Sequence, residues 1–302
     1  MKIIRPITIA DAMLTASSVP EADYAEYLAG TTYAATDRVI VTASGVHKIY
    51  ESLVGGNVGN YPPTDVLAAV PKWLEIGATN RWAVFDDKVG SQASQAASLS
   101  YTLAPGMFDS IALLNMDATG VSIVITDPVD GEVYNRTVDL LSTDNVIDGY
   151  TYCFEPILRK TDLILTDLPP YSTATAIITI TNTGGTAKCG AIILGMKATI
   201  GTTLRSGSVG ITDYSVKTVD AFGNFTIVKR ANAKRGSYDV QILNVLVDEV
   251  FRMLTEQCST SVVWIGIDGY TSTYSYGFYK DFSIVIAGAL RSDCSIEIEG
   301  LT

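Results

Sequence analysis

The chain has 302 residues, of which 47% are hydrophobic and 18% are charged, so it can bury substantial cores and is not a disordered chain. Its net charge of −11 argues against nucleic acid or an anionic membrane as a general partner, because both require clustered Lys and Arg. No apolar run is long enough to span a bilayer, and Pro6 and Asp11 interrupt the N-terminal segment, so we expect neither a membrane span nor a signal peptide.

Residues 1–80 are expected to form a small β domain. Residues 38–42 and 46–52 each predict a short strand, because β-branched residues and tyrosine are bounded there by turn-forming residues. A Gly- and Pro-rich loop follows, and a further short strand begins at Trp73.

Aromatic side chains are spaced between the turns of this domain. The candidate carbohydrate-binding residues are Tyr27, Tyr33, Tyr50 and Trp73. A flat ring offers a large contact area to the apolar face of a sugar and loses little rotamer freedom on binding. The same rings could instead form the core of a domain that is too small to have any other. The sequence leaves both interpretations open.

Residues 81–197 predict an antiparallel β-sandwich of the jelly-roll type. Alternating residues on both sides of Asp130–Gly131 predict a hairpin over residues 120–140. Residues 189–195 form a continuous apolar run, which is typical of a central strand buried on both faces. The predicted strands follow one another without an intervening helix, as they do in sandwiches.

Residues 198–302 predict an α+β domain in which one helix packs on a sheet. Asn244 is expected to cap this helix through its side-chain oxygen. Asp248 and Arg252 are expected to pair one turn apart on the exposed side. The apolar face is expected to consist of Leu246, Val247, Val250, Phe251 and Leu254.

Two further segments of this region carry a clear pattern. Residues 294–299 alternate with a period of two, which places the isoleucines on one face of a strand and the glutamates on the other. The tyrosine-rich run at residues 268–279 suits either a contact patch or a half-buried edge hairpin, because tyrosine combines a large area with a polar tip.

The residue types that carry out catalysis form no recognisable constellation. The single histidine, His47, is interpreted as a surface or strand residue, and Asp127, Asp130 and Asp167 are placed where they favour turn capping. The cysteines form no CxxC pair and are expected to be reduced and structural. They are Cys153, Cys189, Cys258 and Cys294. We therefore expect no enzyme activity and no cofactor, and we assign no metal ligands. The sequence has no EF-hand ligand string, and it leaves open whether a Ca²⁺ ion sits in the sandwich loops.

The pattern of residues 27–73 resembles small chitin-binding-type carbohydrate modules. Those modules have an aromatic residue, a Tyr, a Gly-Asp-x-Val turn, an exposed Tyr strand, a Pro-bearing loop and a closing Trp. The matching positions are Tyr27, Tyr33, Thr36–Val39, Ile49–Tyr50, Pro62–Pro63 and Trp73. Tyr27 stands where the modules usually have Trp, and Thr36 stands where they usually have Gly. The resemblance implies that the four aromatic residues bind carbohydrate.

Nearly all of residues 81–302 is similar to a family of tailed-bacteriophage virion proteins. The phrases that carry this similarity include FEPILRKTDLILTDLPPYSTATAIITITNTGGTAKCGAIILG, GITDYSVKTVDAFGNFTIVKRANAKR and YGFYKDFSIVIAGALRSDCSIEIEGLT. The resemblance implies a structural protein of the tail or tail tip that is assembled in the host cytoplasm and located in the virion. It also implies that the partners are other tail or baseplate proteins and further copies about the tail axis.

Three functional hypotheses follow. The first is a structural virion protein of a phage tail tip or baseplate that assembles with other tail subunits and can contact host surface glycans. The alternative is a carbohydrate-binding adhesion protein whose main task is host glycan recognition. The weakest is a glycan-degrading enzyme, because carboxylates are too abundant here for any pair of them to be informative.

Overall fold

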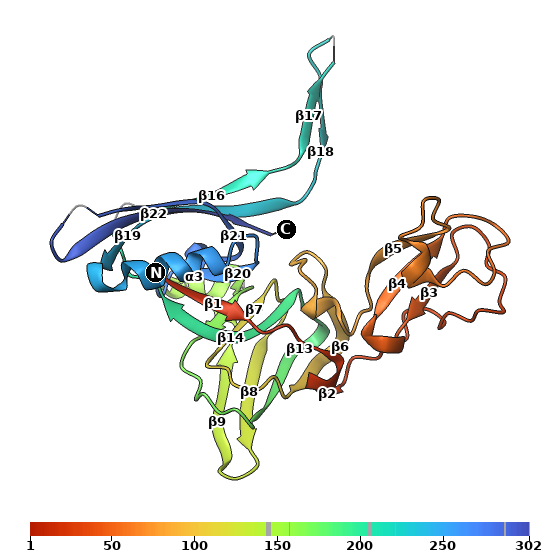
Figure 1. Cartoon of the computed structure of the whole chain (residues 1–302), viewed down its shortest axis with the longest axis horizontal. Helices are drawn as coiled ribbons and strands as arrows, with labels where there is room; N and C mark the ends of the chain where they lie inside the picture. The colour runs from red at the N-terminus through yellow and green to blue at the C-terminus, as the bar shows by residue number, and fades with distance from the viewer. Residues whose placement is uncertain (143–145, 157, 205–206, 221, 287, 302) are drawn as a thin grey trace.

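The computed structural model describes residues 1–142, 146–156, 158–204, 207–220, 222–286 and 288–301, and its fold is mainly β (Figure 1). The largest sheet of this part of the chain has ten antiparallel strands, in the order β12-β7-β14-β1-β20-β21-β22-β19-β15, and β16 also pairs with β19. These strands are β1 (Lys2–Pro6), β7 (Ser110–Leu114), β12 (Leu163–Leu165), β14 (Ala191–Thr199), β15 (Thr202–Thr203), β16 (Ser208–Asp213), β19 (Asn232–Leu243), β20 (Val262–Ile265), β21 (Tyr274–Val285) and β22 (Arg291–Gly300).

A second sheet packs on one half of the large sheet and forms a β-sandwich. Its order is β2-β6-β13-β8-β9. Its strands are β2 (Leu14–Ser17), β6 (Ala93–Leu103), β8 (Gly120–Asp127), β9 (Gly131–Asp139) and β13 (Thr175–Cys189). Every second residue of these strands points into the shared core, where Leu99, Ile123 and Ile178 belong to the same cluster as Leu113 and Ile192 of the large sheet.

The predicted strands of the sandwich are confirmed. β8 and β9 form the hairpin, and Gly131 occupies its turn with a φ of 76°, which glycine adopts without steric cost. β14 lies between β7 and β1, and its apolar residues Ala191–Gly195 are buried. The predicted mainly β fold with an antiparallel sandwich in its middle is therefore confirmed.

β1 joins the two halves of the molecule. It pairs with β14 of the sandwich on one side and with β20 of the C-terminal half on the other, so the expected regions 81–197 and 198–302 share one continuous sheet. β2 pairs with β6 of the second sheet. The expected domain of residues 1–80 is corrected accordingly, because its first two strands belong to the two larger sheets.

The C-terminal half of the large sheet carries the predicted helix, α3 (Val247–Glu256), on one face. Val250 and Leu254 of the helix pack into one core with Trp264 and Ile296 of the sheet. The indole N–H of Trp264 donates a hydrogen bond of 2.9 Å to the carbonyl of Gly277, so the buried ring has its polar atom paired. In β22 the isoleucines are buried and the glutamates point away from this core, as the period of two predicts.

Three details of the helix differ from the prediction. Asn244 begins a 3-10 turn, η4 (Asn244–Leu246), and its side chain donates to the carbonyl of Gly288 at 2.8 Å instead of capping α3. Because this turn delays the start of α3, Leu246 is exposed, and Phe251 also lies on the exposed side. The side chain of Arg252 pairs with Glu256 at 3.9 Å rather than with Asp248.

The small module consists of β3 (Arg38–Val41), β4 (Lys48–Ser52) and β5 (Trp73–Ala78), with α1 (Pro62–Asp65) between the last two. Its three strands are antiparallel, and it stands to one side of the body (Figure 1). The remaining short elements are β10 (Leu141–Ser142), β11 (Leu158–Arg159), α2 (Gly149–Phe154) and the 3-10 turns η1 (Asp11–Met13), η2 (Ala43–Gly45), η3 (Ala83–Phe85) and η5 (Thr271–Thr273).

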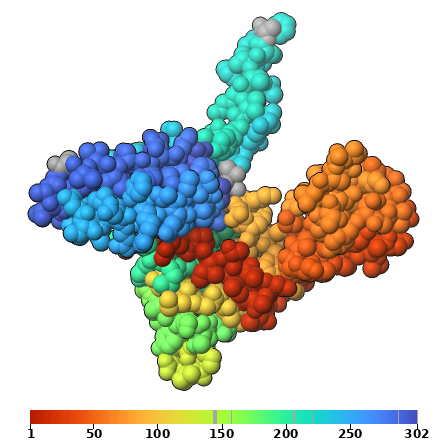
Figure 2. All heavy atoms as spheres, in the orientation of Figure 1, coloured from red at the N-terminus to blue at the C-terminus, as the bar shows by residue number. Residues whose placement is uncertain are grey.

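β17 (Val216–Val219) and β18 (Phe225–Val228) form a two-stranded antiparallel ribbon that projects from the body (Figures 1 and 2). It continues β16 and leads back into β19. We call residues 214–231 the arm.

The four cysteines divide into two pairs by exposure. Cys189 and Cys294 are buried, Cys153 and Cys258 are exposed, and none is in a disulfide. Burial raises the pKa of the Cys189 thiol to about 12 and that of Cys294 to about 11, which suppresses the reactive thiolate.

We therefore expect a thiol reagent to label two thiols rapidly in the native chain and all four after unfolding, counted by mass spectrometry. In a Cys153→Ser, Cys258→Ser variant the native chain should remain unlabelled. Rapid labelling of that variant before unfolding would contradict the burial of the other two thiols.

Candidate functional site

Three of the four candidate carbohydrate-binding side chains lie in the core of the small module. Tyr33, Tyr50 and Trp73 are only 8%, 1% and 1% exposed, and Tyr27 is half-buried against them. A three-stranded sheet has few apolar side chains to bury, and these rings supply most of the volume. The expectation that Tyr33, Tyr50 and Trp73 present an open aromatic face is therefore wrong. These three rings instead form the core of the small module.

The polar atoms of the core rings are used inside the module. The indole N–H of Trp73 donates to the carbonyl of Asn60 at 2.9 Å, and the Tyr33 hydroxyl accepts a 2.8 Å hydrogen bond from the backbone N–H of Leu28. The ring centroids of Tyr33 and Trp73 are 5.1 Å apart in an edge-to-face arrangement. Burial is also the main cause that raises the pKa of Tyr50 to about 12.

The aromatic surface that remains open is formed by Tyr27 and Tyr61. Their ring centroids are 5.8 Å apart, and Tyr61 is 39% exposed. The hydroxyl of Tyr27 is buried without a hydrogen-bond partner among the described residues. Tyr61 is not among the candidate residues predicted from the sequence. The sequence feature that could have identified Tyr61 is its position directly before Pro62–Pro63, because prolines at the start of α1 fix the chain direction there.

The arm is a second candidate site, and the sequence reasoning missed it. All residues of β17 and β18 are exposed, and Phe222 and Phe225 are exposed by 91% and 72%. An isolated two-stranded hairpin is at best marginally stable in water. Exposed apolar groups in one place mark an interaction surface. The arm therefore has the apolar composition of a buried pair of strands, but no other part of the described chain covers it.

The two faces of the arm differ. Cross-strand neighbours share a face of a hairpin. Val219 opposes Phe225 and Lys217 opposes Ile227, so one face is apolar with a single cation. On the other face Thr218 opposes Thr226 and Val216 opposes Val228, so that face is half polar and has no aromatic residue. We call the face of Lys217, Val219, Phe225 and Ile227 the arm face.

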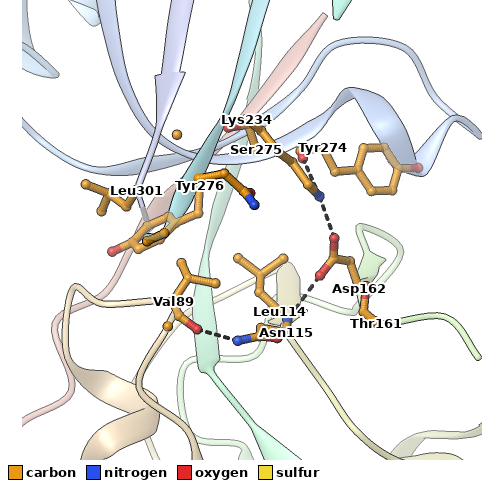
Figure 3. Close-up of a pocket in the computed structure, with 14 residues that line it drawn as sticks. Val89, Leu114, Asn115, Thr161, Asp162, Lys234, Tyr274, Ser275, Tyr276 and Leu301 are labelled. Carbon is orange, nitrogen blue, oxygen red and sulfur yellow. Dashed lines mark hydrogen bonds and ion pairs between the residues drawn. The ribbon is translucent and has the colours of Figure 1, made fainter. Parts of the chain in front are cut away.

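The base of the arm lies beside a hollow of about 330 Å³ between the sandwich and the C-terminal half (Figure 3). It is lined by the loop at residues 89–90, the ends of β7 and β22, residues 161–162, the start of β19, and Tyr274–Tyr276 of β21. Segments far apart in the sequence thus meet around it.

Most of the polar groups in this hollow are paired with one another. Lys234 Nζ of β19 lies 2.6 Å from Asp162 Oδ2, and Asp162 Oδ1 accepts a 3.0 Å hydrogen bond from the backbone N–H of Asn115. The side-chain amide of Asn115 donates in turn to the carbonyl of Val89 at 2.7 Å. Figure 3 shows this chain of contacts running from β19 to the sandwich. We interpret it as the joint that sets the direction of β19 where this strand leaves the arm.

The other residues considered for chemistry have structural partners. His47 is buried rather than on the surface, with Nδ1 2.9 Å from Glu21 Oε1 and its ring stacked on Trp82. Asp127 accepts hydrogen bonds from the Thr173 hydroxyl and from the backbone of the β8–β9 turn, which lower its pKa. Asp167 pairs with Arg136 at 3.0 Å instead of capping a turn.

The tyrosine-rich run at residues 268–279 does not form an edge hairpin. Its second half belongs to β21, which lies inside the large sheet between β20 and β22. Tyr276 is buried there, whereas Tyr270, in the preceding loop, is exposed.

No protein-family model matches this sequence, and no curated protein matches it. In the described part of the chain, no helix is long and apolar enough to cross a membrane. Within the same residues, no three His, Cys, Asp or Glu side chains gather as a metal-binding group would require.

Proposed function

We propose that this protein is a structural subunit of a phage tail tip or baseplate and that it assembles through its arm. The single observation that supports the proposal most is the bare apolar ribbon of β17 and β18, which projects from the body with both faces exposed. Subunits of large assemblies use such extensions to bury apolar surface on a neighbour. The resemblance of residues 81–302 to tailed-phage virion proteins points in the same direction.

The test of this proposal is the composition of purified particles. Phage particles that encode this chain are purified by density gradient, and the chain is quantified by mass spectrometry. The expected result is a fixed number of copies per particle for the wild type. A variant with Phe225→Ser and Ile227→Ser should be lost from particles while a Thr218→Ser, Thr226→Ser control is retained. Absence of the wild-type chain from pure particles would overturn the proposal.

Glycan contact is a second candidate function, and the half-exposed pair Tyr27 and Tyr61 favours it. A sugar ring can stack on the exposed face of Tyr61, whose ring centroid lies 5.8 Å from that of Tyr27. The main task of such a surface would be attachment to a host glycan.

Tyr61→Ala is expected to weaken binding of a chito-oligosaccharide about fivefold, because one aromatic contact contributes about 1 kcal/mol. The matched control is Tyr24→Ala, since Tyr24 is the same residue type with the same 39% exposure in the same module. Isothermal titration calorimetry measures both variants, and circular dichroism verifies their folding. Equal affinity of Tyr61→Ala and the wild type, or no wild-type binding, would remove this function.

A further inference from the structure

We propose that the arm face docks on the far end of the large sheet in a second copy of this chain. The inference rests on the proposed function as an assembly subunit and names the partner and its surface. The acceptor, which we call the distal patch, consists of Leu243, Val245, Ile286 and Leu290, all of which are exposed.

The distal patch is apolar and held in place by hydrogen bonds. The backbone N–H of Asn244 donates to the carbonyl of Leu290 at 3.0 Å, and its side chain donates to Gly288 at 2.8 Å. These bonds tie the end of β19 to the loop between β21 and β22. The backbone at Gly288 and Leu290 is therefore held against the end of β19, which lowers the entropy cost of docking on this part of the patch.

The charges of the two surfaces are opposite. The arm has three basic residues and one aspartate, a net charge of +2, in a chain whose net charge is −11. One of the three, Lys217, pairs with Asp213 at the end of β16 at 3.1 Å. Lys229 and Arg230 are exposed and make no ion pair with any described residue. Asp248 and Glu249 are exposed in the first turn of α3, next to the distal patch, and are likewise unpaired within the described chain. The exposed Arg291 also borders the patch and donates to the side chain of Gln241, so these three residues together carry a net charge of −1. Opposite potentials favour this pairing and disfavour patches of like charge.

An arm cannot reach the distal patch of its own chain. The arm projects where β19 begins, and the patch lies where β19 ends, which for twelve residues of strand is a separation of about 40 Å. Figure 1 shows the arm and the loop between β21 and β22 at opposite ends of the sheet. A contact between the arm face and the distal patch would therefore join two copies, and because it joins different surfaces it would be head-to-tail.

The decisive experiment uses two complementary variants of the full chain. The arm variant carries Phe225→Ser and Ile227→Ser, and the patch variant carries Val245→Ser and Leu290→Ser. These side chains are exposed, so folding should be retained, and circular dichroism verifies it. Light scattering coupled to size exclusion gives the mass of each variant and of their equimolar mixture.

We expect the wild type to form oligomers and each variant alone to associate at least tenfold more weakly. The mixture should form a pair of twice the 32.3 kDa of one chain, because the intact arm of one variant meets the intact patch of the other. The Thr218→Ser, Thr226→Ser control should associate like the wild type. A mixture that stays as single chains, or an arm variant that associates like the wild type, would overturn the inference.

A charge exchange adds an independent readout. Lys229→Glu with Arg230→Glu should weaken association, and Asp248→Lys with Glu249→Lys in the same chain should restore it. Restored association supports the inference, and failure of the exchange to restore it counts against it.

The outcomes separate this inference from the proposed function. A wild type that is monomeric in solution, with an arm variant that is lost from particles, would mean that the arm binds a different tail protein. That result would overturn the second-copy inference and leave the proposed function standing. If the arm variant and the patch variant form the expected pair but the wild-type chain is absent from purified particles, the second-copy inference stands and the proposed function is overturned.

Discussion

Replacement of Trp73 by alanine is expected to destabilise the small module by about 3–5 kcal/mol, the cost of removing a large buried aromatic side chain. Trp73 is 1% exposed, packs edge-to-face on Tyr33, and donates its indole N–H to Asn60. The variant loses this packing and leaves the Asn60 carbonyl without its donor. Hydrogen exchange of β3, β4 and β5 measures the effect, because it reports the module separately from the body.

Tyr61→Ala is the control for this prediction, since Tyr61 lies at the edge of the same ring cluster and is partly exposed. It should cost less than about 1 kcal/mol. A Trp73→Ala module with wild-type protection would show that the ring is not part of the core. The prediction also has a practical consequence, because any loss of glycan binding in Trp73→Ala or Tyr50→Ala would report unfolding rather than a lost ligand contact.

Gly195→Ala is expected to destabilise the junction of the two halves by about 3 kcal/mol, at the upper end of the usual cost of overpacking. A Cβ atom at Gly195 would lie 2.0 Å from the carbonyl oxygen of Arg5 in the neighbouring strand. Backbone cannot move aside as a flexible side chain can, so β1 and β14 would have to separate. Denaturant unfolding followed by circular dichroism measures the change in the free energy of unfolding.

Gly77→Ala is the matched control, because Gly77 also lies in a strand but has no neighbouring atom within 4 Å of the position that a Cβ would occupy. Its φ is not positive, so alanine meets no backbone strain there. This variant should be as stable as the wild type or slightly more so. Equal stability of Gly195→Ala and the wild type would contradict the placement of β1 against β14.

The two candidate sites lie in separate parts of the molecule. The small module and the arm project from the body in different directions (Figures 1 and 2). The arm and the distal patch occupy the ends of one sheet, so a head-to-tail contact would leave the module free of that contact. Under the proposed function, assembly and surface attachment can therefore coexist on one subunit.

The sequence by itself determined the local structure. The turn at Asp130–Gly131, the continuous apolar run of β14, the period of two in β22 and the position of α3 were all predictable. These features depend on neighbours a few residues away, through turn chemistry and the alternation of side chains across a strand. The sequence could not show that Asn244 does not cap α3. Its side chain instead hydrogen-bonds the carbonyl of Gly288, in a loop more than forty residues further along the chain.

Only the tertiary structure decided which surfaces are buried. β1 pairs with strands that lie about 190 and 260 residues further along the chain, and no local pattern specifies such partners. Val219, Phe225 and Ile227 of the arm have the same composition as buried strands, yet they are exposed, whereas Tyr50 and Trp73 are enclosed. The physical reason is that the tendency of a ring or a branched side chain to leave water belongs to the residue, but the layer that covers it comes from distant parts of the chain.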